Sequence, residues 1–325
     1  MTNFFDIVIY GYWLCAGYGS YIIWRDRKNP TTVFGQYKKF SLGVIIILLF
    51  GAVVIFDAHF IEPWTIRTTP VAIDMKNLTA PIKIAFVSDI QVGNHKKSEW
   101  VEKIVERIKQ EKPDLVLLGG DQIDNEGTFE DESVYLEPLK KLVGEYPIYA
   151  VMGNHEYGIG NRVRDNSRYW SGDRSQLEID RFKQLNIPIL HNDLICPEIQ
   201  KQKICLYGVD DPWGSKIDYT NLKNWNQTTP LVLLTHNPDA VMTWPDNITK
   251  PNLTLAGHTH GGQIYLPIIG PLGSAGIDLP KKYYRGLNDY HDIPIYTSVG
   301  IGESGGQLRF WTLPEIAIIT LKPQE

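Results

Sequence analysis

Cysteine and surplus positive charge are scarce in this 325-residue chain, and each shortage excludes a class of protein. Three cysteines are too few for a small disulfide-stabilised fold or for a zinc site built from cysteine. The 32 basic and 37 acidic side chains give a formal net charge of −5. We therefore expect no nucleic acid polymer as a partner, because general phosphate binding needs an excess of lysine and arginine. No obligate protein partner is evident.

Charged side chains are also absent from two long segments near the N-terminus, residues 7–24 and 40–56. As a helix, each would span roughly 25–27 Å, close to the ~30 Å hydrocarbon core of a bilayer. The sequence therefore predicts that residues 1–60 form a membrane anchor of two transmembrane helices, with the lipid bilayer as partner. A cleaved signal peptide fits poorly, because no basic region precedes the first segment. A pair of buried core helices is the other alternative.

The orientation of this anchor follows from its basic residues. Between the two segments stand Arg25, Arg27, Lys28, Lys38 and Lys39. The positive-inside rule places this linker in the cytoplasm. We therefore expect a multi-pass protein of the cell membrane, with everything after Asp57 on the extracytoplasmic side.

The rest of the chain reads as one α/β domain, predicted at residues 81–325 after a connector at 61–80. Helices are expected at 97–109, where the apolar residues form one stripe, and at 134–143. Strands are expected at residues 82–87, 114–118, 148–152, 231–235, 253–256, 295–299 and 316–321. This alternation is typical of a layered sheet protein.

Five of the expected strands are followed at once by residue types that bind metals. These segments are 88–91 (SDIQ), 119–124 (GGDQID), 153–156 (GNHE), 235–237 (THN) and 257–262 (GHTHGG). Each segment alone could be a turn or a helix cap. Ligands of open α/β sheets bind beyond the carboxyl ends of the strands, so the five segments are expected to converge on one crevice.

This ordered set of motifs resembles the calcineurin-like metallophosphoesterase superfamily, over roughly residues 80–321. Four shorter stretches resemble its bacterial membrane-anchored branch: 257–264 (GHTHGGQI), 62–63 (EP), 300–302 (GIG) and 314–316 (PEI). That branch includes enzymes similar to UDP-2,3-diacylglucosamine pyrophosphatase. The resemblance implies a four-layer α/β/β/α sandwich, here preceded by the transmembrane hairpin.

The resemblance also implies two divalent metal ions and the residues that bind them. The implied ligands are Asp89, Asp121 and His260 for the first ion, and Asp121, Asn154, His236 and His258 for the second. Such a centre hydrolyses a phosphodiester, phosphomonoester or pyrophosphate bond by attack of a metal-bridging hydroxide. His155 is the implied catalytic residue that is not a ligand, and Asp124 is expected to orient its imidazole. A turn or helix cap is the alternative role of Asp124.

One position departs from the family pattern, which has histidine two residues after the first aspartate. Gln91 stands there instead. Its amide oxygen could complete a mixed nitrogen and oxygen site, which favours Mn²⁺ over the alternatives Zn²⁺, Fe and Ni²⁺. Alternatively, Gln91 does not coordinate and the first ion binds weakly.

The substrate is expected to be anionic and carried by a lipid, because the predicted anchor lies beside the predicted site. The loop after Glu156 supplies candidate substrate-binding residues: Arg162, Arg164, Arg168, Tyr169 and Trp170. Guanidinium groups suit phosphate, although an ordinary solvated loop is the alternative. Two other functions stay open: a UDP-diacylglucosamine-type pyrophosphatase at the cytoplasmic face, and a catalytically impaired sensor that binds an anion.

The two later cysteines, Cys196 and Cys205, flank a predicted hairpin whose turn is at Gln200 and Lys201. That turn would place them opposite each other. A disulfide and a pair of buried thiols are both open at this point.

Overall fold

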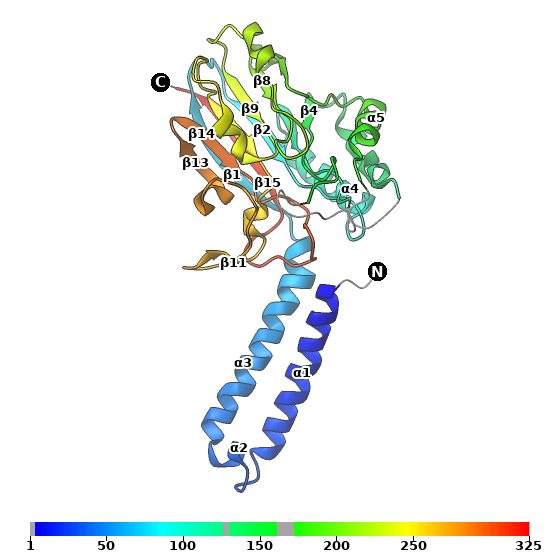
Figure 1. Cartoon of the computed structure of the whole chain (residues 1–325), viewed down its shortest axis with the longest axis vertical. Coiled ribbons are helices and arrows are strands. Elements are labelled where there is room, and N and C mark those ends of the chain that lie inside the picture. Colours follow the sequence, from blue (N-terminus) through cyan, green and yellow to red (C-terminus); the bar gives the residue numbers. More distant parts are fainter. Residues whose placement is uncertain (1–3, 126–129, 161–171, 325) are drawn as a thin grey trace.

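The computed structural model describes residues 4–125, 130–160 and 172–324, which form a helical stalk joined to a two-sheet domain (Figure 1). The stalk consists of α1 (Phe4–Asp26) and α3 (Lys38–Phe56), which run antiparallel and are joined at their far end by α2 (Val33–Gln36). Two hydrogen bonds cross between the long helices. The Tyr12 hydroxyl donates to the Leu48 carbonyl at 3.2 Å, and Trp13 Nε1 donates to the Ala52 carbonyl at 3.1 Å.

Within the part of the chain that the structure describes, one helical segment is long and apolar enough to cross a membrane, Lys38–Trp64. Only 17% of its most apolar window is buried inside the protein, so its side chains do not belong to a protein core. The helix α1 does not meet the same criterion, because glycine and tyrosine dilute its apolar residues. The span predicted at residues 7–24 therefore stays a prediction.

Helical turns follow α3 directly and connect it to the first sheet. The π-helical turn η1 (Asp57–Ile61) continues the axis of α3, and the 3₁₀ turn η2 (Glu62–Trp64) follows it. Next comes β1 (Arg67–Met75), a nine-residue edge strand inside the segment that was predicted to be a connector. Buried Ile73 and Met75 alternate with exposed residues in the second half of this strand, which the sequence did not predict.

The first sheet has five strands in the order β1-β15-β2-β3-β4. The other members are β15 (Glu315–Pro323), β2 (Ile82–Val87), β3 (Leu115–Gly119) and β4 (Ile148–Val151). The strands β2, β3 and β4 are mutually parallel, while β15 is antiparallel to β2 and parallel to β1. Every residue of β3 is buried, as expected for a central strand that is covered on both faces.

The second sheet has six strands in the order β13-β14-β10-β9-β8-β5. They are β13 (Gly286–Tyr290), β14 (Ile293–Thr297), β10 (Leu253–Ala256), β9 (Leu231–Leu234), β8 (Cys205–Gly208) and β5 (Asp193–Ile195). The inner four strands are parallel, and the two edge strands are antiparallel to their neighbours. One small hairpin, β11 (Tyr265–Leu266) with β12 (Gly270–Pro271), projects from the domain.

The two sheets pack face to face and are covered on their outer faces, which gives four layers. Apolar side chains of both sheets share the central core, among them Phe86, Leu206, Val232 and Leu253. The outer face of the first sheet is covered by α4 (Ser98–Glu111), η3 (Glu132–Leu142) and α5 (Ser175–Leu185). The outer face of the second sheet is covered by the short 3₁₀ helices η4 (Thr220–Asn224), η5 (Pro238–Thr243) and η7 (Lys281–Tyr284).

The predicted helix at 134–143 is a 3₁₀ helix, η3, rather than an α-helix. Pro138 lies inside it. Proline lacks an N–H and clashes with the carbonyl of the preceding turn, so an α-helix cannot run through this position undisturbed.

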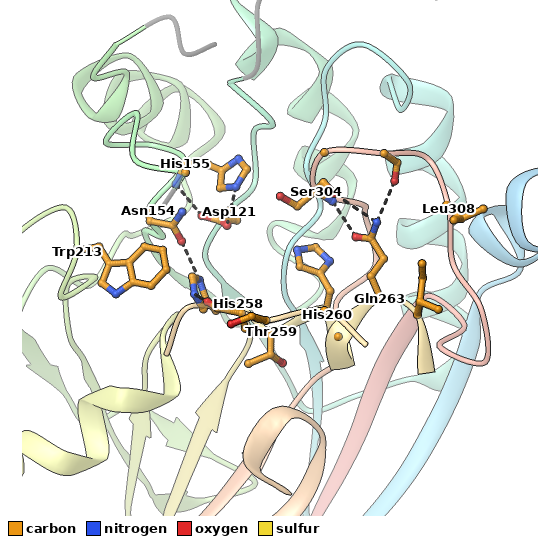
Figure 2. Close-up of a pocket in the computed structure, with 18 residues that line it drawn as sticks. Asp121, Asn154, His155, Trp213, His258, Thr259, His260, Gln263, Ser304 and Leu308 are labelled. Atoms are coloured by element: carbon orange, nitrogen blue, oxygen red, sulfur yellow. Dashed lines mark hydrogen bonds and ion pairs between the residues drawn. The ribbon is translucent and has the colours of Figure 1, made fainter. Parts of the chain in front are cut away.

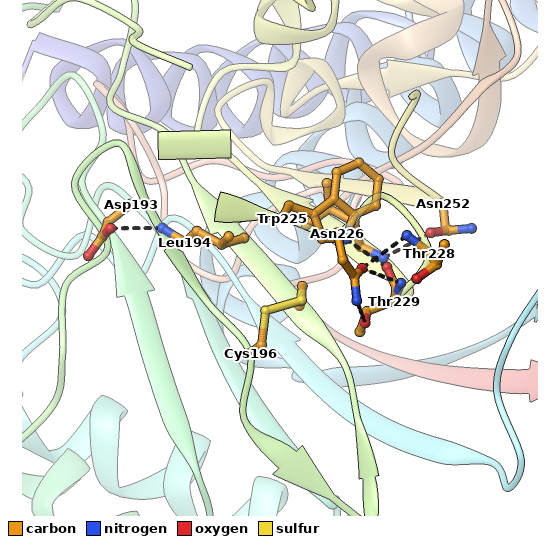
Figure 3. The surroundings of a disulfide bond; sticks show 10 residues. Asp193, Leu194, Cys196, Trp225, Asn226, Thr228, Thr229 and Asn252 are labelled. Carbon is orange, nitrogen blue, oxygen red and sulfur yellow. Dashed lines mark hydrogen bonds between the residues drawn. A yellow bond between two sulfur atoms is a disulfide. The ribbon is translucent and has the colours of Figure 1, made fainter. Parts of the chain in front are cut away.

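Cys196 and Cys205 form a disulfide, which settles the alternative that the sequence left open (Figure 3). Between them lies the predicted hairpin, with strands β6 (Glu198–Ile199) and β7 (Gln202–Lys203). Gln200 and Lys201 both have positive φ, 50° and 59°, as a tight two-residue turn of this hairpin requires.

Candidate metal centre

Five strand ends meet at one edge of the domain, three from the first sheet and two from the second. Each is followed by buried side chains that can bind a metal: Asp89 after β2, Asp121 after β3, Asn154 after β4, His236 after β9, and His258 and His260 after β10. Main-chain bonds hold the neighbouring ends together. The Asp89 N–H donates to the Gly120 carbonyl at 2.9 Å, and the Gly257 N–H donates to the His236 carbonyl at 2.9 Å.

The tightest group consists of Asp121, His236 and His258, whose ligand atoms all lie within 4.8 Å of one another. His236 Nε2 lies 3.0 Å from Asp121 Oδ2 and 3.1 Å from His258 Nδ1. Asn154 Oδ1 lies 2.8 Å from His258 Nδ1, and Figure 2 shows these two side chains pointing toward each other. The structure thus brings together the four residues expected to bind the second ion.

The protonation of the two histidines suits a cation at this point. His236 Nδ1 lies 2.8 Å from the carbonyl oxygen of Gly119, and His258 Nε2 lies 3.0 Å from that of Ala275. A carbonyl only accepts, so these nitrogens carry the protons. When both imidazoles are neutral, the other two nitrogens and the oxygen of Asn154 present lone pairs to one another at hydrogen-bond distance, which a divalent cation between them would satisfy.

The residues expected around the first ion lie beside this group. His260 Nε2 lies 3.4 Å from Asp89 Oδ1. Gln91 is buried, its Nε2 lies 3.5 Å from His155 Nε2, and its Oε1 has no hydrogen-bond partner among the described residues. An unpartnered buried carbonyl oxygen is costly, and coordination of a metal ion by Gln91 would remove that cost.

His155 faces the same centre without joining the ligand group. Its Nε2 lies 3.6 Å from Asp121 Oδ2. Its Nδ1 lies 2.5 Å from the main-chain carbonyl oxygen of Asp124, to which it donates. The predicted orientation of His155 by Asp124 therefore occurs through the backbone of Asp124, because that carbonyl accepts the proton on Nδ1 and so fixes the orientation of the ring.

The electrostatics of the site favour the protonation states that a metal needs at Asp121 and His258, but not at His236. Burial alone would raise the pKa of Asp121, but the His155 and His236 imidazoles outweigh it and lower that pKa. Burial lowers the pKa of His258 to about 3, so its imidazole is neutral. Burial opposes protonation of His236 as well, but Asp121 raises its pKa well above the ordinary value. Metal binding would therefore displace a proton from His236.

Glu156 joins two loops that carry candidate ligands, a role that the sequence did not predict. Its carboxylate accepts the N–H groups of Gln122 and Gly153 at 2.8 and 2.6 Å, and that of Asp121 at 3.1 Å. Gly153 is required by this packing, since a Cβ there would stand 2.2 Å from Asp121 Oδ1. The glycine thus lets Asp121 approach the loop that carries Asn154.

Arg309 supports the site from behind and was not found from the sequence. It is fully buried, and its guanidinium donates to Glu303 at 3.0 Å and to the main-chain carbonyls of residues 299, 300, 302 and 312. It also lies 3.5 Å from His260 Nδ1. The loop it holds is bonded to the first ligand, because the Gly302 N–H donates to the Asp89 carbonyl at 2.6 Å.

Lys96 completes this buried ionic cluster. Its ammonium donates to Glu303 at 2.9 Å, to the Ile301 carbonyl at 3.0 Å and to the Pro63 carbonyl at 2.8 Å. Burial lowers the pKa of Lys96 to about 8, against the opposing effect of Glu303. The cluster joins the turn that follows the apolar helix to the loop beside the metal ligands.

A cavity of about 330 Å³ opens over the centre, with Asp121, Asn154, His155, His258 and His260 on its floor (Figure 2). Trp213 forms one wall, with its ring 4.6 Å from that of His258. Segments on both sides of the β11–β12 hairpin and residues 304–306 with Leu308 form the rest. The predicted substrate-binding residues Arg162, Arg164, Arg168, Tyr169 and Trp170 lie outside the described residues.

Comparison with known proteins decides the family. Residues 82–262, more than half of the chain, match the model of the calcineurin-like phosphoesterase family. The chain belongs to the calcineurin-like phosphoesterase family. Membership makes it a hydrolase of phosphoric esters that works with divalent metal ions, and the donor set described above fits such ions. The narrower membrane-anchored branch and the choice of Mn²⁺ stay predictions.

Named relatives agree with this family. The chain is 30% identical to the metallophosphoesterase YkuE of Bacillus subtilis over 271 residues, covering 82% of this chain and 88% of that protein. It is 29% identical to the phosphodiesterase YaeI of Escherichia coli over 267 residues, covering 81% and 91%. A metallophosphoesterase of Helicobacter pylori is 32% identical, and the chain spans 64% of its length. The solved structure of the E. coli phosphoesterase Yfce is a remote likeness, with 14% identity, a TM-score of 0.33, and coverage of 69% and 83%.

Proposed function

We propose that this chain is a membrane-anchored phosphoesterase that hydrolyses the phosphate ester of a lipid-borne substrate on the extracytoplasmic side. One observation carries the proposal: the wall of the cavity is bonded to the end of the apolar helix. The Arg309 N–H donates to the Ala58 carbonyl at 2.8 Å, and His59 Nδ1 donates to the Gln307 carbonyl at 2.6 Å. Leu308, between these two contacts, lines the cavity.

The anchor is supported by the exposure of its apolar side chains. Large side chains on both long helices are 65–75% exposed, among them Ile47, Phe50 and Val53 of α3 and Leu14 and Tyr18 of α1. Side chains of this kind belong in lipid rather than in water. Both helices would then span, and the bilayer would end near η1, directly below the cavity.

The side of the membrane is supported by two features. The basic linker lies at the α2 end of the stalk, far from the sheets (Figure 1), and the positive-inside rule places that end in the cytoplasm. The Cys196–Cys205 disulfide belongs to an oxidising compartment. No observation favours the cytoplasmic pyrophosphatase or the impaired sensor, since the donor set of the second ion is complete.

The chemistry follows from the placement of the side chains. When bound, two divalent ions lower the pKa of a water molecule and neutralise charge on the phosphoryl oxygens. One carboxylate oxygen of Asp121, Oδ2, lies 3.0 Å from His236 Nε2 and 3.6 Å from His155 Nε2, so it is within reach of both a proposed ligand and the proposed catalytic histidine. His155, held by the Asp124 carbonyl, presents Nε2 to the cavity; as an imidazolium, with a proton on each nitrogen, it can stabilise the phosphoryl charge or protonate the leaving oxygen.

The proposal is tested with the full-length protein in detergent, stripped of metal by a chelator. Turnover of bis(p-nitrophenyl) phosphate is measured with Mn²⁺, Zn²⁺, Mg²⁺ and Ni²⁺ for the wild type, Asp121→Asn and the exposed control Asp246→Asn. We expect turnover to depend on metal. Asp121→Asn should lower turnover by more than roughly 10–100-fold, which is the usual effect of removing a residue that only supports a metal ligand. Full activity of Asp121→Asn would contradict the assigned centre.

The lipid part is tested separately in proteoliposomes. One p-nitrophenyl phosphodiester is offered as a water-soluble ester and as an ester with a long acyl chain. Preference for the acylated ester supports the lipid substrate. Equal turnover of the two esters would refute the lipid-borne substrate, while the proposed phosphoesterase activity would stand.

A further inference from the structure

The β11–β12 hairpin presents an apolar tip to solvent at a backbone position that disfavours it. Its tip residues, Ile268 and Ile269, are fully exposed and 69% exposed. Ile268 also has φ of 75°, a left-handed conformation that β-branched residues rarely adopt. Glycine or asparagine would fit this turn better and would cost less in water. Folding therefore does not explain the two isoleucines, whereas an apolar environment at the tip would.

The hairpin lies at the end of the domain that the apolar helix enters. The Tyr265 N–H donates to the Phe310 carbonyl at 2.8 Å, and the next residue, Trp311, donates its N–H to both carboxylate oxygens of Glu62 at 2.8 Å. Glu62 is part of η2, at the end of the apolar segment. Figure 1 shows β11 projecting sideways at the level where α3 meets the domain.

The residues beside the base of the hairpin are those found where proteins meet lipid headgroups. Trp311 and Leu272 are 58% and 52% exposed. Lys281 Nζ donates to the Pro271 carbonyl at 2.8 Å, and the Arg285 guanidinium lies 4.8 Å from the centre of the Tyr265 ring. Aliphatic residues inserted below tryptophan, with lysine and arginine at headgroup height, form a membrane interface with a preference for anionic lipids.

We propose that the tip of the β11–β12 hairpin inserts into the leaflet that surrounds the outer end of α3, with Trp311 and Leu272 at its boundary. This inference rests on the proposed membrane anchor. The bilayer is favoured over a second protein copy because the hairpin is joined through Phe310 and Trp311 to η2, at the end of the anchor.

The insertion would place the mouth of the cavity on the membrane. Gly262, Gln263 and Ile264 before the hairpin and Gly273 after it line the cavity. The hairpin is therefore an extension of the cavity wall. A lipid phosphate beside the tip would reach His258 and His260 without leaving the membrane surface.

The test attaches an environment-sensitive nitrobenzoxadiazole label to single cysteines of the full chain in phosphatidylcholine–phosphatidylglycerol vesicles, with quenching by spin-labelled lipids. The labelled sites are Ile269→Cys and the control Met242→Cys, both in a Cys15→Ala background, and native Cys15 itself. Met242 is 45% exposed but lies with Tyr290 and His291, at the end of the second sheet opposite the metal ligands. The cysteines of the disulfide do not react.

We expect strong quenching at Ile269→Cys and Cys15, and none at Met242→Cys. Quenching at Cys15 alone would overturn the hairpin proposal and leave the anchor intact. No quenching at Cys15 would overturn both. A disulfide-linked dimer of Ile269→Cys, without quenching, would identify a second copy as the occupant and also overturn it.

A functional comparison uses Ile268→Ser with Ile269→Ser against Met242→Ser. Turnover of the soluble ester should be unchanged in both. Turnover of the acylated ester in vesicles should fall roughly tenfold in the hairpin variant only, about the factor for losing the burial of one aliphatic side chain. Equal turnover of the acylated ester by both variants would refute a role of the tip in reaching lipid.

Discussion

Arg309→Lys is the substitution that best tests the buried support of the metal centre. The guanidinium contacts four main-chain carbonyls and the carboxylate of Glu303. A lysine ammonium keeps the charge but has only three donors. At least two buried acceptors would lose their partner, and each loss costs about 1–3 kcal/mol. We therefore expect a loss of about 2–6 kcal/mol in the free energy of unfolding.

The functional consequence follows from the loop that Arg309 holds. That loop is bonded to Asp89 and Ser88 through the N–H groups of Gly302 and Ile301, at 2.6 and 3.0 Å. Loosening it would displace Asp89, so the variant should need more metal for half-maximal turnover. At saturating metal, its KM for a soluble ester should be nearly unchanged.

The assay is thermal unfolding of the full-length protein in detergent, followed by metal titration of turnover. The expected destabilisation corresponds to a Tm that is lower by about 5–20 °C. The control is Arg107→Lys, because Arg107 is only partly buried and its side-chain hydrogen bond goes to another side chain, that of Gln110, at 3.2 Å; it should stay within about 0.5 kcal/mol of the wild type. If the two variants have the same Tm and need the same metal concentration for half-maximal turnover, the carbonyls do not depend on the guanidinium and the reasoning fails.

Two further predictions concern the disulfide and the unusual ligand. Replacing Cys196 and Cys205 together by serine should lower the free energy of unfolding by about 2.7 kcal/mol, from the loop entropy of a cross-link with sequence separation 9. A reductant should lower the Tm of the wild type by as much as the double substitution does. If neither change affected stability, the prediction would be contradicted. Gln91→His should shift the metal preference of turnover from Mn²⁺ toward Zn²⁺ if the amide oxygen coordinates; an unchanged order and affinity would show that Gln91 is not a ligand.

The sequence predicted those parts of the fold that depend on local pattern. The strands β2 and β3 are short, mostly apolar runs that are buried except at Lys83, and they begin and end within about one residue of their predicted bounds. The helix α4 begins and ends within two residues of its prediction, because its apolar stripe alone fits a helical period. The strand β1 was missed because its edge position gives it only weak alternation and Pro70 interrupts it.

The residues of the site also fall into those that the sequence predicts and those that it does not. The side chains that converge on the cavity could be selected because they follow strands directly, where topology gathers them. Lys96, Glu303 and Arg309 could not be selected, because Lys96 and Glu303 are 207 residues apart and carry no motif. Burial of such charges is apparent only when the partners that neutralise them are in place.

The arrangement of residues 299–312 gives the centre a fixed height above the proposed membrane. This segment holds Asp89 through Gly302, lines the cavity through Leu308 and bonds to η1 and η2 through Arg309 and Trp311. From α3 onward, η1, η2 and β1 leave only two residues outside regular structure before the first sheet begins. An enzyme on a flexible tether would have to search for its substrate by swinging. Here the cavity wall is hydrogen-bonded to the end of the proposed anchor at two points, so lateral diffusion in the bilayer is the motion that we expect to bring a lipid to the metal ligands.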